Sequence, residues 1–502
     1  MAHSPPIPRV LRRLLKAGAG AILLGVAAPA AAAVGFPAFS PHVVVVRFAR
    51  HASPVARAAD LRGSGSLDAG PMTASTRRLR LARGVSVARA LRLLRRSPGV
   101  VWAEPDYIAH AADFPTPSSD PTLVPQVAPT SPPFLPNDPG RLGPGGWAQL
   151  QWNFAGPFGV NAPEAWSNLI ADGHPGGQGV IVAVLDTGVA YANRGRFHRS
   201  PDFTAAQFVR GYDFVNRNQY PNDDNGHGTQ VAGTIAERTD NGIGLTGLAY
   251  GVRIMPVRVL DGRGDGDASA IADGVVFAVR HHAQIINLSL EFTSDVTAAS
   301  VPVLADALSF AHARGVLVVS AAGNEGTSRI AYPARAPYVV AVGASTEHGC
   351  PADFSNHGHG LDILAPGGGD DARLPRAEDP NCMPEGPSGA DIYQETLIGG
   401  SPRRFGLPSG YEGTSMATPH VSAAAALVIA SGVLGPHPSA QAIVARLKAT
   451  ARPLGPAADT ARFGAGLLDA GAATLPGGPG AIAAGGSPPA TGVLSTAPSA
   501  SA

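Results

Sequence analysis

The chain has 502 residues, of which 44% are hydrophobic and 15% are charged. Such a length excludes a single small domain, and the composition is typical of a folded soluble protein with segments of low complexity. The net charge of +1 hides an asymmetry, because residues 1–110 hold 16 of the 38 basic side chains but only 4 of the 37 acidic ones. A division of charge of this kind indicates parts with different roles.

Residues 1–33 have the three parts of a secretory signal. Four basic side chains precede the apolar stretch AGAGAILLGVAAPA, and an alanine run ends at Ala33. A membrane anchor that stays attached is the alternative, but roughly 14 apolar residues are fewer than the ~20 that span a bilayer. We expect export and cleavage, and therefore a secreted protein, extracellular or periplasmic, without a stable membrane anchor.

Residues 34–110 are predicted to form a small α/β module. HVVVVRF and RLRLAR are predicted strands, Ser86 is the expected N-cap of a helix over VARALRLLRRS, and the strand VVWAE follows. A basic module would suit nucleic-acid binding, but its arginines have no aromatic residues interleaved with them. Because the rest of the chain is acidic, we expect the module to bind that remainder and no nucleic acid.

Residues 111–146 are rich in proline and are predicted to be a linker, because such a composition does not form a hydrophobic core. From 147 to 475, apolar strands such as IVAVLD, QIINLSL and VLVVS alternate with helical patterns. This alternation predicts an α/β fold with a mostly parallel sheet and helices on both faces. Residues 476–502 are a Pro/Gly/Ala/Ser tail.

Four polar residues are candidates for chemistry in this domain. Asp186 ends the strand IVAVLD, at the sheet edge where ligands bind in open α/β sheets, although it would also suit a turn cap. His227 begins a helix between two glycines and is either functional or structural. Asn324 follows the strand VLVVS, and its amide would serve a turn or an oxyanion. Ser415, where an apolar helix begins, is either an N-cap or a nucleophile.

These residues lie in motifs that together resemble one family. Asp186, His227 and Ser415 occur in the order Asp…His…Ser that is known from subtilisin. VAVLDTGV, GHGTQVAGTIA, SAAGNEG and GTSMATPHV each resemble a signature of the subtilisin-like (subtilase) serine peptidases. The resemblance covers roughly residues 150–475, and it implies a subtilisin-like fold and hydrolysis of peptide bonds.

The resemblance implies a role for each of the four residues. Ser415 Oγ would attack the scissile carbonyl, and His227 would take its proton and pass it to the leaving amine. Asp186 would orient the imidazole and stabilise its charged form. Asn324, with the backbone N–H of Ser415, would bind the oxyanion of the tetrahedral intermediate. No cofactor is expected for this chemistry.

The resemblance also implies that an extended peptide binds between two backbone segments, GRGDGD and NLSLEF. The residues expected to contact it are Gly264, Gly266, Ser289, Leu290, Glu291, Gly323, Glu325 and Ala331. Small residues around Gly323 indicate room for a sizeable apolar or aromatic side chain. Where the family commonly has Ser-Leu-Gly-Gly, this chain has SLEF, and we hypothesise that Glu291 and Glu325 make basic residues acceptable in the first pocket.

The chain has two cysteines, Cys350 and Cys382. In an exported protein they are expected to form a disulfide, and two free thiols are the alternative. The stretches NDDNG and GRGDGD are acidic enough to hold calcium. The resemblance likewise implies structural calcium, but the sequence assigns no ligands to it.

The resemblance also gives the basic module a role, since residues 34–110 are similar to the inhibitory prosegment of subtilases. Such a prosegment assists folding and blocks the substrate cleft until it is cut off, here within the range 108–148. The sequence thus predicts a secreted serine endopeptidase that is made as a zymogen and acts on proteins or peptides. A processing protease dedicated to one partner and a non-catalytic binding module on the same fold are the alternatives.

Overall fold

The structure, a computed structural model, describes residues 38–112, 134–374, 381–456 and 459–477. The predicted signal peptide, most of the predicted linker and nearly all of the predicted tail lie outside these residues. Among the described residues, no helix is both long enough and apolar enough to cross a membrane.

Residues 38–112, called the N-terminal module below, form an antiparallel sheet with strand order β4, β1, β3, β2 and two helices. Its elements are β1 (Phe39–Phe48), α2 (Pro54–Ser64), β2 (Ser66–Pro71), β3 (Thr76–Leu81), α3 (Val87–Leu94) and β4 (Val100–Ala111). The predicted N-cap of α3 is confirmed, because the Ser86 hydroxyl accepts a hydrogen bond from the N–H of Arg89 at 3.3 Å. Leu91 and Leu94 of α3 share a buried cluster with Val44 of β1, so the module has a core of its own.

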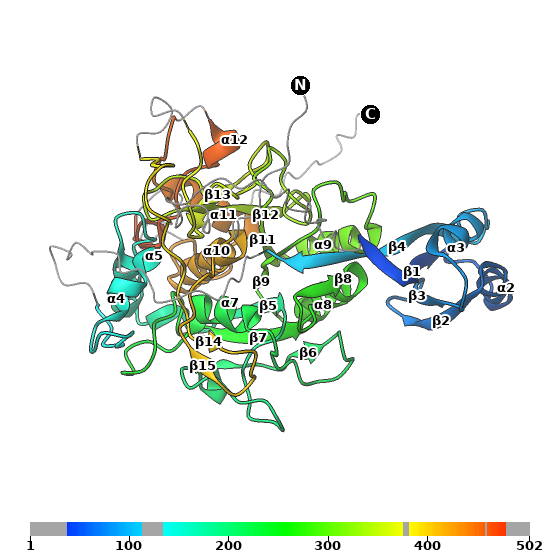
Figure 1. Cartoon of the computed structure of the whole chain (residues 1–502), viewed down its shortest axis with the longest axis horizontal. Coiled ribbons are helices and arrows are strands. Elements are labelled where there is room, and N and C mark those ends of the chain that lie inside the picture. Colours follow the sequence, from blue (N-terminus) through cyan, green and yellow to red (C-terminus); the bar gives the residue numbers. More distant parts are fainter. Residues whose placement is uncertain (1–37, 113–133, 375–380, 457–458, 478–502) are drawn as a thin grey trace, which may run out of the picture. The chain divides into compact units, whose positions relative to one another are not determined.

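The rest of the described chain, called the large domain below, is built on a seven-stranded sheet (Figure 1). All of its strands are parallel, in the order β13, β12, β11, β9, β5, β7, β6. Their bounds are β5 (Ile181–Asp186), β6 (Tyr212–Asp213), β7 (Arg253–Arg258), β9 (Ile285–Leu288), β11 (Leu317–Ala321), β12 (Val339–Ser345) and β13 (Ile363–Pro366). The predicted parallel α/β sheet is therefore confirmed.

Helices cover both faces of this sheet. Val182 and Val184 of β5 belong to one buried cluster, with α7 (His227–Ala236) and α10 (Thr414–Ala430). Ala183 and Leu185 belong to a second buried cluster, with α8 (Ala268–Arg280) and α9 (Pro302–Ala313). Because successive side chains of a strand point to opposite faces, β5 is apolar on both sides.

Shorter elements complete the large domain. They are α4 (Trp147–Leu150), α5 (Trp152–Ala155), α6 (Ala162–Ala171), η1 (Pro175–Gly177), η2 (Ala205–Gln207), β8 (Asp265–Asp267), β10 (Leu290–Glu291), β14 (Thr396–Leu397), β15 (Phe405–Gly406), α11 (Ala440–Thr450), α12 (Thr460–Phe463) and α13 (Ala470–Thr474). Residues 134–146, at the end of the predicted linker, lie against this domain, where the Trp147 indole donates to the Pro136 carbonyl at 2.9 Å. The predicted pairing of Cys350 with Cys382 is confirmed by a disulfide bond.

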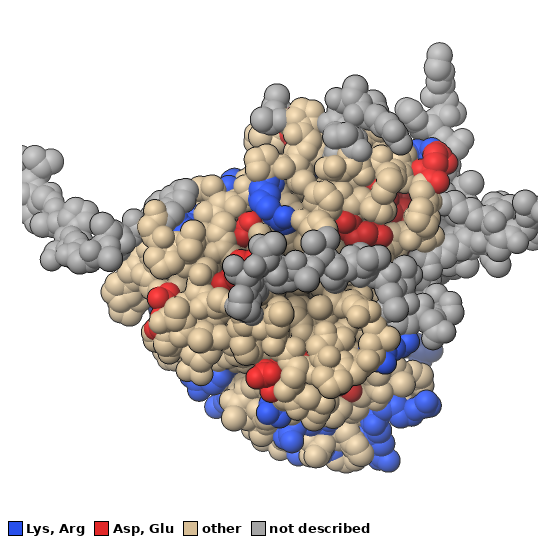
Figure 2. All heavy atoms as spheres, turned by 90° about the vertical axis from the view of Figure 1, so that its left-hand side faces the viewer, with Lys and Arg blue, Asp and Glu red and all other residues tan. Residues whose placement is uncertain are grey.

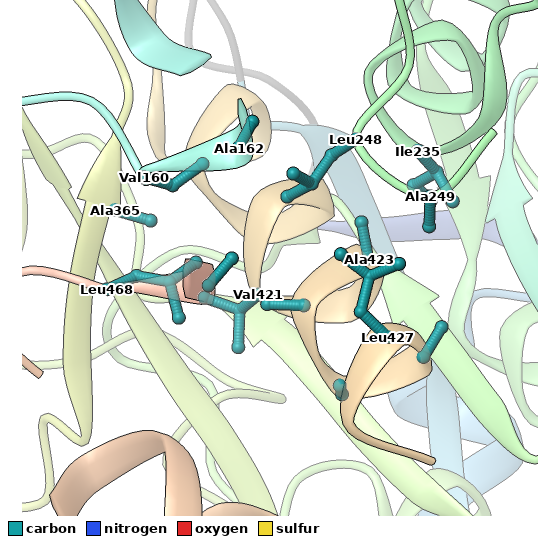
Figure 3. Packing of buried hydrophobic residues seen from close by; sticks show 14 of the residues in the cluster. Val160, Ala162, Ile235, Leu248, Ala249, Ala365, Val421, Ala423, Leu427 and Leu468 are labelled. Carbon is teal, nitrogen blue, oxygen red and sulfur yellow. The ribbon is translucent and has the colours of Figure 1, made fainter. Parts of the chain in front are cut away.

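Helix α10 is buried over most of its length. Figure 3 shows Val421 and Ala423 of this helix among apolar side chains of other segments, including Leu248 and Leu468. A helix that is apolar on all sides is typical of a protein core. Ser415, the second residue of α10, is therefore carried by a rigid, buried element.

On the face shown in Figure 2, most described side chains are uncharged, basic ones gather toward the lower edge and acidic ones are scattered above them.

Candidate active site

The carboxyl end of β5 and the start of α7 bring Asp186 and His227 together. Asp186 Oδ1 lies 2.7 Å from His227 Nδ1, and both side chains are buried. The same oxygen accepts the N–H of Thr187 at 2.7 Å. Two residues predicted from separate motifs thus form one hydrogen-bonded pair, in which the carboxylate fixes the orientation of the imidazole.

The glycines beside His227 are required for this approach. A Cβ on Gly228 would lie 2.1 Å from the carbonyl oxygen of Gly188, a distance that no side chain tolerates. Gly226 has a φ of 116°, which side-chain-bearing residues rarely adopt. The GHG sequence therefore lets the start of α7 pass directly against the loop after β5.

Asp223 is a supporting residue for which the sequence indicates no role beyond possible calcium binding in NDDNG. Its carboxylate accepts hydrogen bonds from the hydroxyls of Thr187, at 3.0 Å, and Thr229, at 2.6 Å. Thr187 follows Asp186 and Thr229 lies in the first turn of α7, so Asp223 joins the two segments that carry the pair. Burial raises the pKa of Asp223, while these donors oppose the shift. The sequence signal for this role is weak, because an acidic turn before a helix is common.

Ser415 is not the N-cap of α10, because Gly413 occupies that position. The Ser415 hydroxyl donates to the carbonyl oxygen of Ser289 at 2.9 Å, so its one proton faces the residue that directly precedes β10. Pro419 lies four residues further along the helix and has no N–H for the Ser415 carbonyl. That carbonyl instead accepts the hydroxyl of Ser289 at 2.8 Å. Because of this proline, the Ser415 carbonyl is available for a hydrogen bond that connects α10 with Ser289, the residue before β10.

Asn324 lies just after β11, close to the start of α10. Its Oδ1 accepts the N–H of Thr414 at 2.9 Å and the Thr414 hydroxyl at 2.8 Å. Its buried Nδ2 has no hydrogen-bond partner among the described residues. A buried donor without a partner costs about 1–3 kcal/mol, so this group is poised for an acceptor that arrives from outside the domain.

The two predicted substrate segments hold the last part of β4. β8 pairs with β4 on one side, placing Gly266 opposite Ala109, and β10 pairs on the other, placing Leu290 opposite Ala111. The N–H of Ala111 donates to the carbonyl of Gly264 at 2.9 Å. An extended strand of this chain therefore lies where an extended peptide was expected.

This strand brings Ala112 to Ser415. The backbone N–H of Ser415 donates to the carbonyl oxygen of Ala112 at 3.0 Å, and the N–H of Ala112 donates to the carbonyl of Ser289 at 3.4 Å. The Ala112 carbonyl is thus fixed beside the Ser415 side chain by backbone contacts alone.

The remaining predicted pocket residues surround the turn after β11. The Glu291 carboxylate accepts the N–H of Asn324, with both of its oxygens at 3.2 Å. Burial raises the pKa of Glu291 to about 8. Ala331 closes the other side of the turn, because its N–H donates to Ala322 at 2.8 Å. Glu325 is exposed, and its carboxylate accepts the N–H of Ser294 at 3.3 Å.

Three buried carboxyl groups lie together elsewhere in the large domain. The oxygens of Asp202, Glu237 and Glu395 lie within 4.8 Å of one another. Burial raises the pKa of Asp202 to about 8 and that of Glu395 to about 7, and it also raises the pKa of Glu237. Among the described residues, none donates a hydrogen bond of normal geometry to Asp202 Oδ2 or to either Glu237 oxygen. Such oxygens fit a hard cation such as calcium, which prefers carboxylate ligands.

The two stretches that are acidic enough to hold calcium, NDDNG and GRGDGD, have acidic side chains that contact protein groups. In NDDNG, Asp224 pairs with Arg258 at 2.7 Å. In GRGDGD, Asp265 pairs with His110 at 2.7 Å. Asp261, directly before this stretch, accepts the N–H of Arg263 at 2.8 Å. The structure therefore points to the cluster of Asp202, Glu237 and Glu395 as the candidate cation site.

Comparison with known proteins agrees with this geometry. Residues 177–466 match the profile of the Subtilase family. The chain is 38% identical to Subtilisin Savinase of Lederbergia lenta over 63% of this chain and 96% of that protein. It is 33% identical to the Thermophilic serine proteinase of Bacillus sp. (strain AK1) over 69% of this chain and 67% of that protein. A solved protease structure from Pseudoalteromonas arctica PAMC 21717 aligns with a TM-score of 0.54 and 30% identity, covering 68% of this chain and 99% of that one. The chain therefore belongs to the subtilase family and is a serine endopeptidase.

Proposed function

We propose that the chain is a secreted peptidase, made as a zymogen, in which Asp186, His227 and Ser415 act as a catalytic triad. The observation that carries this proposal is the hydrogen bond from the Ser415 N–H to the carbonyl of Ala112. It lies where backbone segments clamp an extended strand. The helix that carries Ser415, α10, shares a buried cluster with α7, which begins at His227.

The chemistry follows from the groups at this position. Ser415 Oγ leaves the Ser289 carbonyl by rotation about its side-chain bond and attacks the scissile carbonyl carbon. His227 takes the hydroxyl proton at Nε2 and then gives it to the leaving amine. Asp186, hydrogen-bonded to Nδ1, keeps the imidazole in the tautomer whose Nε2 carries the lone pair that accepts the proton, and it stabilises the imidazolium that forms.

Two donors serve the oxyanion. The Ser415 N–H already contacts a carbonyl oxygen at 3.0 Å, and the buried Asn324 Nδ2 has no other partner among the described residues. As the carbonyl oxygen becomes an anion, both hydrogen bonds strengthen, and this lowers the barrier. The Asn324 Oδ1 contacts with Thr414 hold the amide in this orientation.

The N-terminal module acts as the inhibitory prosegment in this proposal. Its strand β4 occupies the cleft like a substrate and ends with the Ala112 carbonyl at Ser415. Away from the cleft, Asp106 accepts the N–H of Ser269 at 2.9 Å, in the first turn of α8, and Arg78 donates to the Ser269 hydroxyl at 2.8 Å. We place the maturation cut at the bond between Ala112 and Asp113, within the range predicted from the sequence.

Export and calcium binding complete the proposal. The signal-like residues 1–33 support secretion, and a disulfide bond is typical of an exported protein. Calcium at Asp202, Glu237 and Glu395 would have a structural role. It would join three segments: the loop between β5 and η2, the end of α7 and the long segment before α10. No catalytic step uses it.

Single and double variants of the purified protein test the triad. Ser415→Ala and His227→Ala should each lower kcat on casein by about 10⁶, the magnitude known from subtilisin, a member of this family. The double variant should be no worse than either single one, because the residues act as a unit. Ser431→Ala and His437→Ala, which change the same residue types outside the site, serve as controls. A wild-type chain that matures but does not digest casein would favour a dedicated processing protease, and one that does neither would favour a binding module.

A further inference from the structure

We propose that Glu291 fills the pocket for the side chain that precedes the scissile bond, so that this peptidase cuts after small residues such as alanine. The inference rests on the proposed function, because it takes Ala112 as occupying the place of a substrate residue.

The position of Ala112 defines the pocket. Its carbonyl oxygen accepts the N–H of Ser415 and its own N–H donates to Ser289, so both of its backbone groups are held. The residue is completely buried. Whatever side chain a substrate places here must therefore fit between β10 and the turn that follows β11.

Glu291 crosses this space. It belongs to β10, where it pairs with His110, but its carboxyl group reaches the N–H of Asn324 on the neighbouring turn, at 3.2 Å from each oxygen. The side chain thus spans from one wall of the pocket to the other. A glycine at this position, as in the Ser-Leu-Gly-Gly pattern common in the family, would leave that space open.

The turn itself is tightly lined. An ideal Cβ on Gly323 would lie 2.6 Å from Glu291 Oε2, 2.9 Å from the Ala331 Cβ and 2.3 Å from Asn356 Nδ2. These three groups therefore pack directly against the Gly323 backbone. Since protein interiors are close-packed, a large side chain enters only if Glu291 leaves its hydrogen bond with Asn324.

The charge of the pocket favours small over basic residues. Burial raises the pKa of Glu291 to about 8, so near pH 7 the group is mostly the neutral acid. A neutral carboxyl that already accepts a backbone N–H attracts lysine or arginine weakly. Glu325 is exposed, where its charge is screened by water and salt. Size, rather than charge, therefore decides which residue is accepted.

The segment that the cleft holds has the composition expected from this pocket. Ala109, Ala111 and Ala112 flank one larger residue, His110, which pairs with Asp265 at 2.7 Å. Ala109 is completely buried, in the apolar cluster that also contains Leu260 and Leu290. The chain thus presents small side chains to its own cleft at the two buried positions, Ala109 and Ala112.

A peptide-library profile of the matured enzyme tests the proposal. The number of active sites is first measured on one portion of the enzyme with a fluorophosphonate. A preparation without labelled sites would mean that the peptidase assignment fails. A preparation with labelled sites but another cleavage preference would mean that only the specificity assignment fails. An unlabelled portion of the same wild-type preparation should cut mainly after alanine, serine or glycine. Glu291→Gly should raise the ratio of kcat/KM for phenylalanine over alanine by about 10-fold or more, as expected when a pocket gains the volume of several methylene groups.

Two further variants make each outcome decisive. Glu291→Gln keeps the size of the side chain and should keep the small-residue preference, and Glu385→Gln, an exposed acid outside the site, should leave the profile unchanged. Cutting by the wild type mainly after phenylalanine or leucine would overturn the proposal. Cutting mainly after arginine or lysine would also overturn it and would support the acidic-pocket hypothesis drawn from the sequence.

Discussion

The backbone N–H of Ser415 and the carbonyl oxygen of Ala112 form a hydrogen bond of 3.0 Å. Ser415 lies in the first turn of α10, a helix that is buried over most of its length, and Ala112 directly follows β4, the last strand of the N-terminal module. The contact fixes which carbonyl of the chain faces the proposed nucleophile. The position of Ser415 therefore also indicates which bond is cut during maturation.

The first prediction concerns the maturation cut. The secreted wild-type enzyme should begin at Asp113, because the Ala112 carbonyl is the one that Ser415 faces. Ser415→Ala should keep this bond intact, whereas Ser431→Ala should mature normally. N-terminal sequencing and intact mass measure both. A new N-terminus other than Asp113, formed within minutes of folding, would contradict the placement of β4 in the cleft.

The second prediction concerns the oxyanion. Asn324→Ala should lower kcat by about 10²–10³ and change KM little, because the amide bonds the anion more strongly than the ground-state carbonyl; this magnitude is the one known for subtilisin itself. Asn216→Ala, an exposed asparagine on a loop, is the control. If KM rose while kcat stayed constant, Asn324 would instead be a substrate-binding residue.

Local sequence patterns predicted much of the fold and the core of the site. Strands such as IVAVLD and the Ser86 helix cap depend on neighbouring residues, and the structure has both. Asp186, His227, Asn324 and Ser415 lie at strand ends and helix starts, and parallel strands bring such positions to one edge of a sheet. Their glycine-rich surroundings are visible in the sequence because close approach requires them.

Features that depend on distant partners were not predictable. The strand VVWAE continues through Pro105 to Ala111, because β8 and β10 supply its partners from far along the chain. Glu395 reaches its buried cluster from the long segment before α10, and the acidic turns that looked suited to calcium have protein partners instead. The direction of the Glu291 side chain across the pocket likewise depends on a contact that sequence spacing does not encode.

The third prediction concerns the carboxylate cluster. Without a cation, folding keeps protons on Asp202 and Glu395, whose pKa values burial raises to about 8 and about 7. The unfolded chain loses these protons near pH 4, so this contribution to stability is complete below that pH and is lost as the pH rises toward 8. In a chelator, Tm should therefore fall over this range.

Calcium should reverse this loss. At 100 times its Kd it would add about 2.7 kcal/mol to the free energy of unfolding at pH 8. Glu237→Gln should weaken the calcium effect on Tm, and Glu385→Gln should not. Equal calcium responses in both variants would place the ion elsewhere.

The fourth prediction concerns release of the N-terminal module. At its contact with α8, burial raises the pKa of Asp267 to about 7 and that of Asp273 to about 6, and the nearby Asp106 adds to both shifts while Arg78 opposes them. Burial raises the pKa of Asp106 as well.

Binding of the module to α8 therefore takes up protons, and the cut module should dissociate faster as the pH rises from 5.5 to 8.5. The rate at which activity appears after maturation measures this, and Asp273→Asn should flatten the profile. Faster release at low pH would contradict it.

The most direct test of the central claim is the reaction of the purified, secreted protein with a fluorophosphonate, followed by intact-mass measurement and peptide mapping. We expect one adduct, on Ser415, in a chain that begins at Asp113, and loss of casein digestion in the same sample. No adduct on a chain of that length, or an adduct on another serine, would contradict the assignment of Ser415 as the nucleophile.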